Sequence, residues 1–180
     1  ITIGSIGVLA SPSVRTLSAN LVIVSSGSLL ACAAINSVEA TSAALYYMVH
    51  STLASAALFL LADLISRQRG QAEDRFVKSR MFTQPKLMGF AFAIVALSLV
   101  GMPPFSGFVG KVMILQATQS SVQTMWVWPL ILIGSLGALV TFSRAGTTLF
   151  WRHSGSASND AEPASKSEIA AIALLLLAAP

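Results

Sequence analysis

The chain of 180 residues contains 54% hydrophobic and only 10% charged residues, and its mean hydropathy is +0.75. A soluble domain carries about 25% charged residues, so this composition excludes an ordinary soluble protein and predicts a polytopic membrane protein. The formal net charge of +4 comes from basic residues between apolar runs, which is typical of membrane flanks rather than of nucleic-acid binding. We therefore expect a lipid bilayer around the chain and no nucleic-acid partner.

The apolar runs predict one all-α membrane domain over residues 1–180, a bundle of transmembrane helices, because lipid tolerates only helices and closed barrels. The expected helices are residues 1–10 in part, 17–35, 41–65, 87–118 with a break near 102–107, 125–150, and 169–180 in part. A span needs about 20 residues. Since the first and last runs are shorter than that, we expect the chain to be a piece of a longer polypeptide.

Lysine and arginine are unevenly distributed over the loops between these runs. Basic side chains occur at Arg15, within residues 66–86 and within residues 144–166, whereas the loops 36–39 and 119–124 contain none. Cytoplasmic loops of membrane proteins are enriched in Lys and Arg. The alternation predicts a multi-pass protein of the cell membrane with its basic loops in the cytoplasm, and a bacterial plasma membrane is the expected location.

The run over residues 87–118 carries a helix-breaking sequence and then a single lysine. Proline removes a backbone donor and clashes with the preceding turn, and glycine lets the chain bend and lets neighbours approach closely. The residues that we assign to the break are Gly101, Pro103, Pro104 and Gly107. We expect the irregular backbone to be buried against protein, because lipid cannot satisfy its polar groups. A broken membrane helix followed by one charge, Lys111, is typical of an ion or proton site.

Two titratable side chains in the apolar runs are the candidates for proton transfer. Lys111 lies about seven residues, or roughly 10 Å, from the outer end of its helix, and His50 lies about nine residues, or roughly 13 Å, from the same face. We expect them to share a depth and to form a proton relay. The structural alternatives are a lysine that snorkels to the interface and a packed histidine. The expected polar lining around them is Ser51, Thr52, Ser55 and Ser106.

Other polar residues have simpler interpretations. Asp63 and Arg67 are spaced i,i+4, which predicts a local ion pair. Arg144 is expected to cap its span on the cytoplasmic side, on a lipid phosphate or an internal carbonyl. Because the sequence contains no Cys/His cluster and no phosphate-binding loop, we expect neither a metal site nor a cofactor.

Three stretches resemble the antiporter-like membrane subunits shared by Mrp-type multisubunit cation/proton antiporters and respiratory complex I. They are residues 44–53 (ALYYMVHSTL), 57–61 (ALFLL) and 101–111 (GMPPFSGFVGK). The sequences RQRG at 67–70 and RAG at 144–146, followed by LFW at 149–151, are similar to the D-type subunit of the Mrp antiporter in particular. Some complex I subunits carry a lysine four residues after the histidine, where this chain has Ala54.

The resemblance implies that the chain is the C-terminal part of a longer subunit. It also implies an antiporter-like subunit fold in which Lys111 lies at the outer end of a buried polar axis that includes His50. It implies a membrane subunit of a monovalent cation (Na⁺ or K⁺)/proton antiporter, a secondary transporter rather than an enzyme, with other membrane subunits of a hetero-oligomeric complex as partners. The alternative is a proton-pumping membrane subunit of NADH:quinone oxidoreductase or of a membrane-bound hydrogenase. A third interpretation is a structural bundle in which Lys111 only anchors a lipid.

Overall fold

The computed structural model describes residues 1–79, 82–119, 124–151 and 165–179, and no β-strand occurs within these ranges. The helices are α1 (Thr2–Ala10), α2 (Val14–Ile35), α3 (Val38–Arg69), α4 (Pro85–Val100), α5 (Ser106–Thr118), α6 (Thr124–Gly146) and α7 (Lys166–Ala178). A 3₁₀ turn, Gly70–Ala72, follows α3, and a π-helical turn, Thr147–Trp151, follows α6. The predicted all-α class is confirmed.

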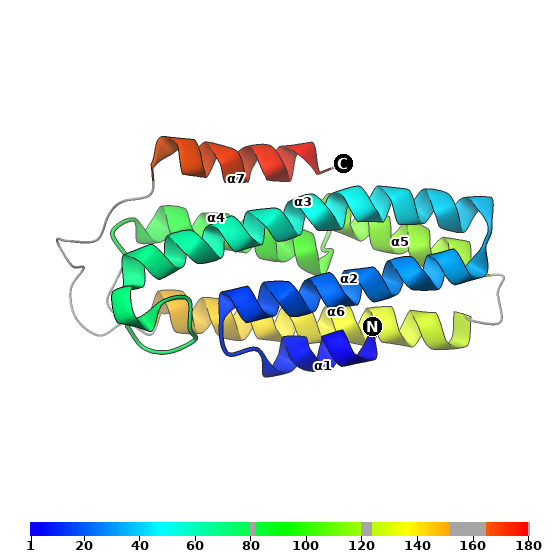
Figure 1. Ribbon diagram of the computed structural model, residues 1–180, viewed down its shortest axis with the longest axis horizontal. Helices are drawn as coiled ribbons and strands as arrows, with labels where there is room; N and C mark the ends of the chain where they lie inside the picture. Colours follow the sequence, from blue (N-terminus) through cyan, green and yellow to red (C-terminus); the bar gives the residue numbers. More distant parts are fainter. Residues whose placement is uncertain (80–81, 120–123, 152–164, 180) are drawn as a thin grey trace.

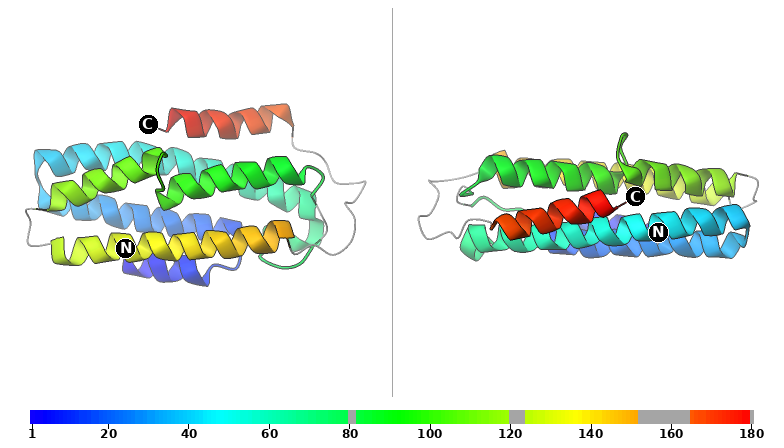
Figure 2. Two further views of the ribbon diagram at one scale, coloured as in Figure 1. Left: turned by 180° about the vertical axis from the view of Figure 1, so that it is seen from behind. Right: turned by 90° about the horizontal axis from the view of Figure 1, so that it is seen from above.

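The helices run along one common axis in two layers (Figures 1 and 2). One layer contains α2 and α3 with the short α1, and the other contains α6 and the consecutive helices α4 and α5. Helix α7 lies along the outer side of α3. Within the described residues, three helical stretches are long and apolar enough to cross a membrane: Val14–Ile35, Val38–Ala72 and Thr124–Trp151.

Helices α2 and α3 each begin three residues before the start that hydropathy suggests, because serine side chains cap them. Ser13 accepts a hydrogen bond from the Thr16 N–H (3.3 Å), and Ser37 accepts one from the Ala40 N–H (3.1 Å). Each serine thereby satisfies one of the N–H groups that a helix start leaves free. Hydropathy marks the apolar part of a span, whereas the cap marks where the helix begins.

The turn between α1 and α2, the loop between α3 and α4, and the end of α6 lie at one end of the bundle (Figure 1). There the predicted ion pair is present, since Arg67 lies 3.1 Å from Asp63, and Asp63 also pairs with Arg15 of α2 at 3.1 Å. Arg67 further pairs with Glu168 of α7. These contacts tie three helices together at this end.

The charged loop after α3 is folded rather than extended into solvent. Arg69 is 3% exposed and donates to the Ser79 hydroxyl (2.8 Å). It also donates to three loop carbonyls, those of Glu73, Arg75 and Val77. The loop reaches the start of α2, where the Val14 N–H donates to the Asp74 carbonyl (3.1 Å). The sequence analysis assigned no structure to this loop.

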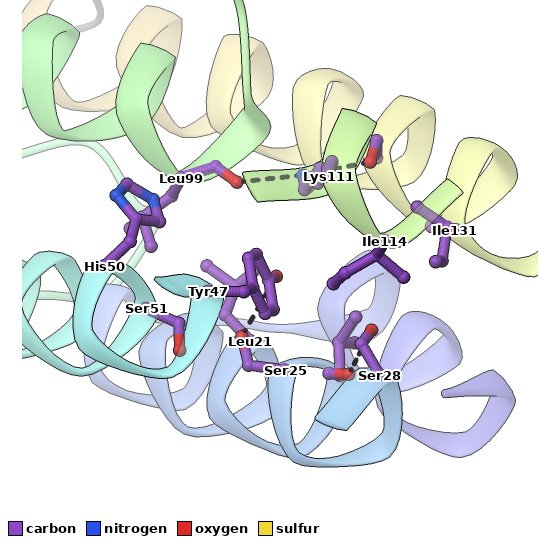
Figure 3. Close-up of a pocket in the computed structure, with 14 residues that line it drawn as sticks. Leu21, Ser25, Ser28, Tyr47, His50, Ser51, Leu99, Lys111, Ile114 and Ile131 are labelled. Carbon is purple, nitrogen blue, oxygen red and sulfur yellow. Dashed lines mark hydrogen bonds between the residues drawn. The ribbon is translucent and has the colours of Figure 1, made fainter. Parts of the chain in front are cut away.

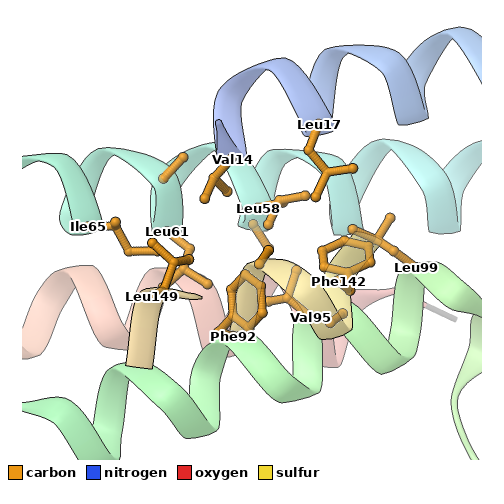
Figure 4. Close-up of a cluster of buried hydrophobic side chains, with 14 of the residues drawn as sticks. Val14, Leu17, Leu58, Leu61, Ile65, Phe92, Val95, Leu99, Phe142 and Leu149 are labelled. Atoms are coloured by element: carbon orange, nitrogen blue, oxygen red, sulfur yellow. The ribbon is translucent and has the colours of Figure 1, made fainter. Parts of the chain in front are cut away.

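Two clusters of buried apolar side chains occupy different lengths of the bundle. The larger one joins α2, α3, α4 and α6 near the loop end (Figure 4) and includes Leu58 and an edge-to-face pair, Phe92 and Phe142, with ring centroids 5.8 Å apart. The smaller one includes Tyr47 of α3 and Ile114 of α5. On α3, His50 lies between Tyr47 of the smaller cluster and Ala54 of the larger one. The packing therefore places His50 where the two clusters meet.

The predicted helix break is confirmed, with two differences. The irregular segment is 101–105, so Ser106 and Gly107, which we placed in the break, are the first residues of α5. The helix can restart at Ser106 because both prolines, which disfavour a helix interior, lie before it. Met102, Pro103 and Pro104 are exposed, and the connection projects from the bundle (Figure 2, right).

The expectation that the whole break is buried is therefore wrong for these three residues. Proline has no N–H to satisfy, so exposing this part of the backbone leaves fewer unmet donors than another sequence would. Gly101 begins the break at φ +79°, a left-handed conformation that glycine adopts without strain.

Parts of two predicted loops, residues 120–123 and 152–164, lie outside the described residues, together with Arg80.

Candidate functional site

His50 of α3 contacts both sides of the helix break. Its Nδ1 lies 2.8 Å from the Ser106 hydroxyl in the first turn of α5, and its ring also hydrogen-bonds the backbone carbonyl of Ser98 in the last turn of α4. The close approach depends on Gly107, because a Cβ there would lie 2.0 Å from the Ser98 oxygen and 2.7 Å from His50 Nε2. His50 is 1% exposed, so it is held within the bundle at the break.

Lys111 of α5 reaches back to the end of α4. Its Nζ donates to the carbonyl of Leu99 (3.1 Å) (Figure 3). It also donates to the carbonyl of Val100 (2.6 Å) and to the hydroxyl of Ser135 on α6 (3.0 Å). An ammonium has three donors, and all three are used. The ammonium is thus held by groups of α4 and α6, which does not fit the snorkelling interpretation.

These two side chains complete the hydrogen bonding at the end of α4. The last four carbonyls of a helix have no partner within it. The Gly101 N–H approaches the carbonyls of Leu97 (3.1 Å) and Ser98 (3.2 Å), His50 bonds Ser98, and Lys111 bonds the final two. The negative end of the helix dipole also favours a cation at this position. The break therefore supplies acceptors for both candidate residues.

Lys111 and His50 line one small internal cavity with a volume of about 20 Å³. A buried water needs about 10–15 Å³ of such volume, so the cavity is large enough for about one water molecule. Its other polar lining residues are Tyr47, whose hydroxyl lies 3.4 Å from that of Ser25, and the serines Ser25, Ser28, Ser51 and Ser135. The cavity thus gathers polar side chains inside the bundle, and apolar residues such as Leu21, Leu99 and Ile114 complete its lining (Figure 3).

The structure separates the four serine and threonine residues that we predicted as lining. Ser51 lines the cavity, and Ser106 bonds His50 directly. Thr52 and Ser55 instead line a second hollow of about 310 Å³ between α2 and α3. Residues advance by about 100° around a helix, so Thr52 points about 200° away from His50. Ser51 borders both spaces.

Sequence reasoning did not assign Tyr47, Ser25, Ser28 or Ser135 to the site. Tyr47 precedes His50 by three residues and so shares its helix face, a spacing that could have indicated its position. Serines in a membrane helix are equally typical of close helix packing, so the other three carried no specific signal.

Arg144 performs the structural role predicted for it. Its guanidinium donates to the carbonyls of Leu9 (3.0 Å) and Ser11 (3.2 Å), where α1 ends. This is the internal-carbonyl alternative, and it ties α6 to α1 away from Lys111. Among the described residues, no group of three His, Cys, Asp or Glu side chains could hold a metal ion.

Residues 1–141 match the protein family described as "NADH:quinone oxidoreductase/Mrp antiporter, TM". The chain belongs to this family. The assignment confirms the resemblance seen in the sequence and covers α1 to α5 and most of α6.

Two relatives of this chain are named as antiporter subunits of the D type. A Rhizobium meliloti protein, named as a probable K⁺/H⁺ antiporter subunit of this type, is 31% identical over 179 aligned residues, which cover 84% of this chain and 33% of that protein. The D-type subunit of a Na⁺/H⁺ antiporter from Bacillus subtilis is 32% identical over 148 residues, or 82% of this chain and 30% of the relative. This chain therefore spans about a third of the length of these relatives.

A solved structure supports the same fold. One chain in the structure of the Mrp complex from Dietzia sp. superposes with a TM-score of 0.70 and 25% identity, covering 89% of this chain and 29% of that chain. The antiporter-like fold expected from the sequence is confirmed by this match.

Proposed function

We propose that this chain belongs to a membrane subunit of a multisubunit monovalent cation/proton antiporter, which exchanges Na⁺ or K⁺ for protons across the cell membrane together with other membrane subunits. The proposal is supported by the family, by the names of the relatives, and by three helical stretches of membrane length among the described residues. Lys111 and His50 carry protons within it.

The observation that carries the proposal is the shared position of two titratable side chains at one helix break. Both line a cavity that is large enough for about one water, and both are held by backbone or hydroxyl groups of that break. A charge inside the membrane is costly and usually serves function. A water between the two side chains would connect them for proton transfer.

The hydrogen bonds of His50 fit the neutral ring, which has one N–H donor and one acceptor nitrogen. Its bond to the Ser98 carbonyl needs the N–H, and Nδ1 is then free to accept from the Ser106 hydroxyl. On protonation the ring gains a second N–H, and the Ser106 hydroxyl accepts instead. Both states of His50 therefore keep their partners, as a relay residue requires.

A proton-pumping subunit of NADH:quinone oxidoreductase is the second candidate, because the family description names both kinds of complex. The same relay serves either complex, and the driving reaction differs. In an antiporter, cations cross the membrane in exchange for protons, whereas in the oxidoreductase electron transfer drives the movement of protons.

The test is cation-dependent proton exchange in everted membrane vesicles from bacteria that express the gene for this chain with its neighbouring subunit genes. We expect added Na⁺ or K⁺ to dissipate an imposed pH gradient without NADH. Lys111→Met should abolish this exchange, and Lys78→Met, which alters a loop lysine, should not. Proton pumping that requires NADH and shows no cation exchange would favour the second candidate.

A further inference from the structure

A third hollow, which the proposed relay does not use, lies on the other side of α4. It has a volume of about 750 Å³ and runs between α4, α6 and the π-helical turn Thr147–Trp151. Figure 2 (left) shows α4 and α6 side by side on this face of the bundle. The volume is within the range of about 300–1,000 Å³ that small-molecule sites occupy. We call it the α4–α6 groove.

The lining of the α4–α6 groove is suited to a hydrocarbon chain. Its lining includes two small residues of α4, Gly89 and Ala96, and the aromatic side chains of Phe142, Phe150 and Trp151. The one threonine in the lining, Thr147, donates its hydroxyl to the Ser143 carbonyl of its own helix (2.8 Å). The Thr147 hydroxyl is therefore already used as a donor, and the lining of the groove is mostly apolar.

The loop end of the groove carries a cation and an exposed aromatic ring. Lys86, in the first turn of α4, and Trp151 both line this end, and Trp151 is 76% exposed. No carboxylate in the described part of the chain forms a salt bridge with Lys86. Tryptophan is enriched at membrane interfaces, and basic side chains between membrane helices on the cytoplasmic side bind anionic lipid headgroups.

The length of the groove also fits a lipid. From Lys86 to Val100, both of which line it, α4 rises by about 21 Å at about 1.5 Å per residue. Half of a hydrocarbon core of about 30 Å is about 15 Å. An acyl chain that starts at the Lys86 end can therefore lie along the groove over the whole depth of its leaflet.

We propose that the α4–α6 groove binds an anionic phospholipid, with its phosphate at Lys86 and one acyl chain along α4. The far end of this site is the last turn of α4, where Leu97 and Val100 line the groove. The carbonyl of the same Val100 accepts a hydrogen bond from Lys111. A bound acyl chain supports this turn from behind and so keeps the acceptors of Lys111 in place. The link to transport rests on the proposed function, whereas lipid binding does not.

The experiment uses the purified complex that contains this chain, reconstituted with phosphatidylglycerol that carries a photoreactive group on its acyl chain. Peptides are then mapped by mass spectrometry. We expect labelling of peptides from α4 and from 142–151. Lys86→Ala should lower the labelling by phosphatidylglycerol about fivefold, the effect of one basic residue at the membrane surface, and should leave labelling by phosphatidylcholine unchanged. Ala96→Phe should fill the groove and abolish labelling by both lipids.

Matched controls are Lys78→Ala, a loop lysine outside the groove, and Ile133→Phe, an exposed position on α6 that does not line it. Unchanged labelling in Lys86→Ala and Ala96→Phe would overturn the proposal. A disulfide between Ala93→Cys and a cysteine introduced in a helix of another subunit would also overturn it, because a protein helix would then occupy the groove.

The transport readout separates this proposal from the proposed function. Exchange by the wild-type complex should be faster in phosphatidylglycerol than in phosphatidylcholine vesicles, and Lys86→Ala should remove the difference. Specific labelling without any cation exchange would refute the antiporter function and leave the lipid site standing. Equal exchange in both lipids would refute the proposal that a bound acyl chain supports the last turn of α4.

Discussion

The Lys111 ammonium has two roles that substitutions can separate, because it holds the end of α4 and, by our proposal, exchanges a proton. Its Nζ bonds the carbonyls of Leu99 and Val100. Lys111→Met keeps an unbranched side chain, one atom shorter, but removes the donors and the charge. Lys111→Gln keeps two N–H donors but cannot titrate. The pair therefore distinguishes a structural role from a role in proton transfer.

The magnitudes for Lys111→Met follow from the hydrogen bonds. Each buried carbonyl left without a partner costs about 1–3 kcal/mol, or about 2–6 kcal/mol for the two. Removing a charge from the membrane interior recovers about 2.5–3.5 kcal/mol. The difference runs from a gain of about 1.5 to a loss of about 3.5 kcal/mol, so we expect a net loss of about 1 kcal/mol in stability. Lys111→Gln is one atom shorter and can donate to at most two of the three acceptors, but it also loses the charge, so its stability should exceed that of Lys111→Met.

The assay is cation-driven proton exchange in everted vesicles, with the amount of assembled complex measured in parallel and thermal stability measured in detergent. We expect both variants to lose exchange and Lys111→Met to be the less stable of the two. Wild-type exchange by Lys111→Gln would refute proton transfer at this residue. Equal stability of Lys111→Met and Lys111→Gln would refute the role of the ammonium in holding the end of α4.

Three further predictions test His50, the packing at the helix break and the topology. His50→Gln keeps hydrogen-bonding capacity but cannot titrate. Because a positioned proton-transfer group is worth roughly 100-fold or more in rate, vesicles with this variant should contain normally assembled complex and show little exchange. Full exchange would mean that His50 has only a packing role. Gly107→Ala places a Cβ 2.0 Å from the Ser98 oxygen and should destabilise the complex by about 1–3 kcal/mol in thermal unfolding, whereas the control Gly137→Ala, whose Cβ finds its nearest atoms at 3.5 Å, should have little effect. Cysteines at Gln71 and Val38 should react with an impermeant maleimide from opposite sides of the membrane, and labelling of both from one side would contradict the topology.

The sequence by itself determined the class of protein and singled out the two candidate residues. An apolar chain with few charges has no stable fold in water, and a lysine or histidine in such a chain is conspicuous because burying it is costly. Two adjacent prolines end a helix by removing donors, whatever the surroundings. These are properties of residue type and local order, so the break, Lys111 and His50 could all be found from the sequence.

Only the tertiary structure decided which groups meet at the break. Ser135 on α6 bonds Lys111 across 24 positions of sequence, and Ser106 bonds His50 across 56. Such partners depend on how each helix is rotated about its axis. In lipid, apolar patterning says little about that rotation, because the outward face of a helix is apolar too. Hence Thr52 and Ser55, close to His50 in sequence, line a different space. The four carbonyls at the end of α4 likewise found partners from α3, from α5 and from the break itself, which no local pattern in the sequence specifies.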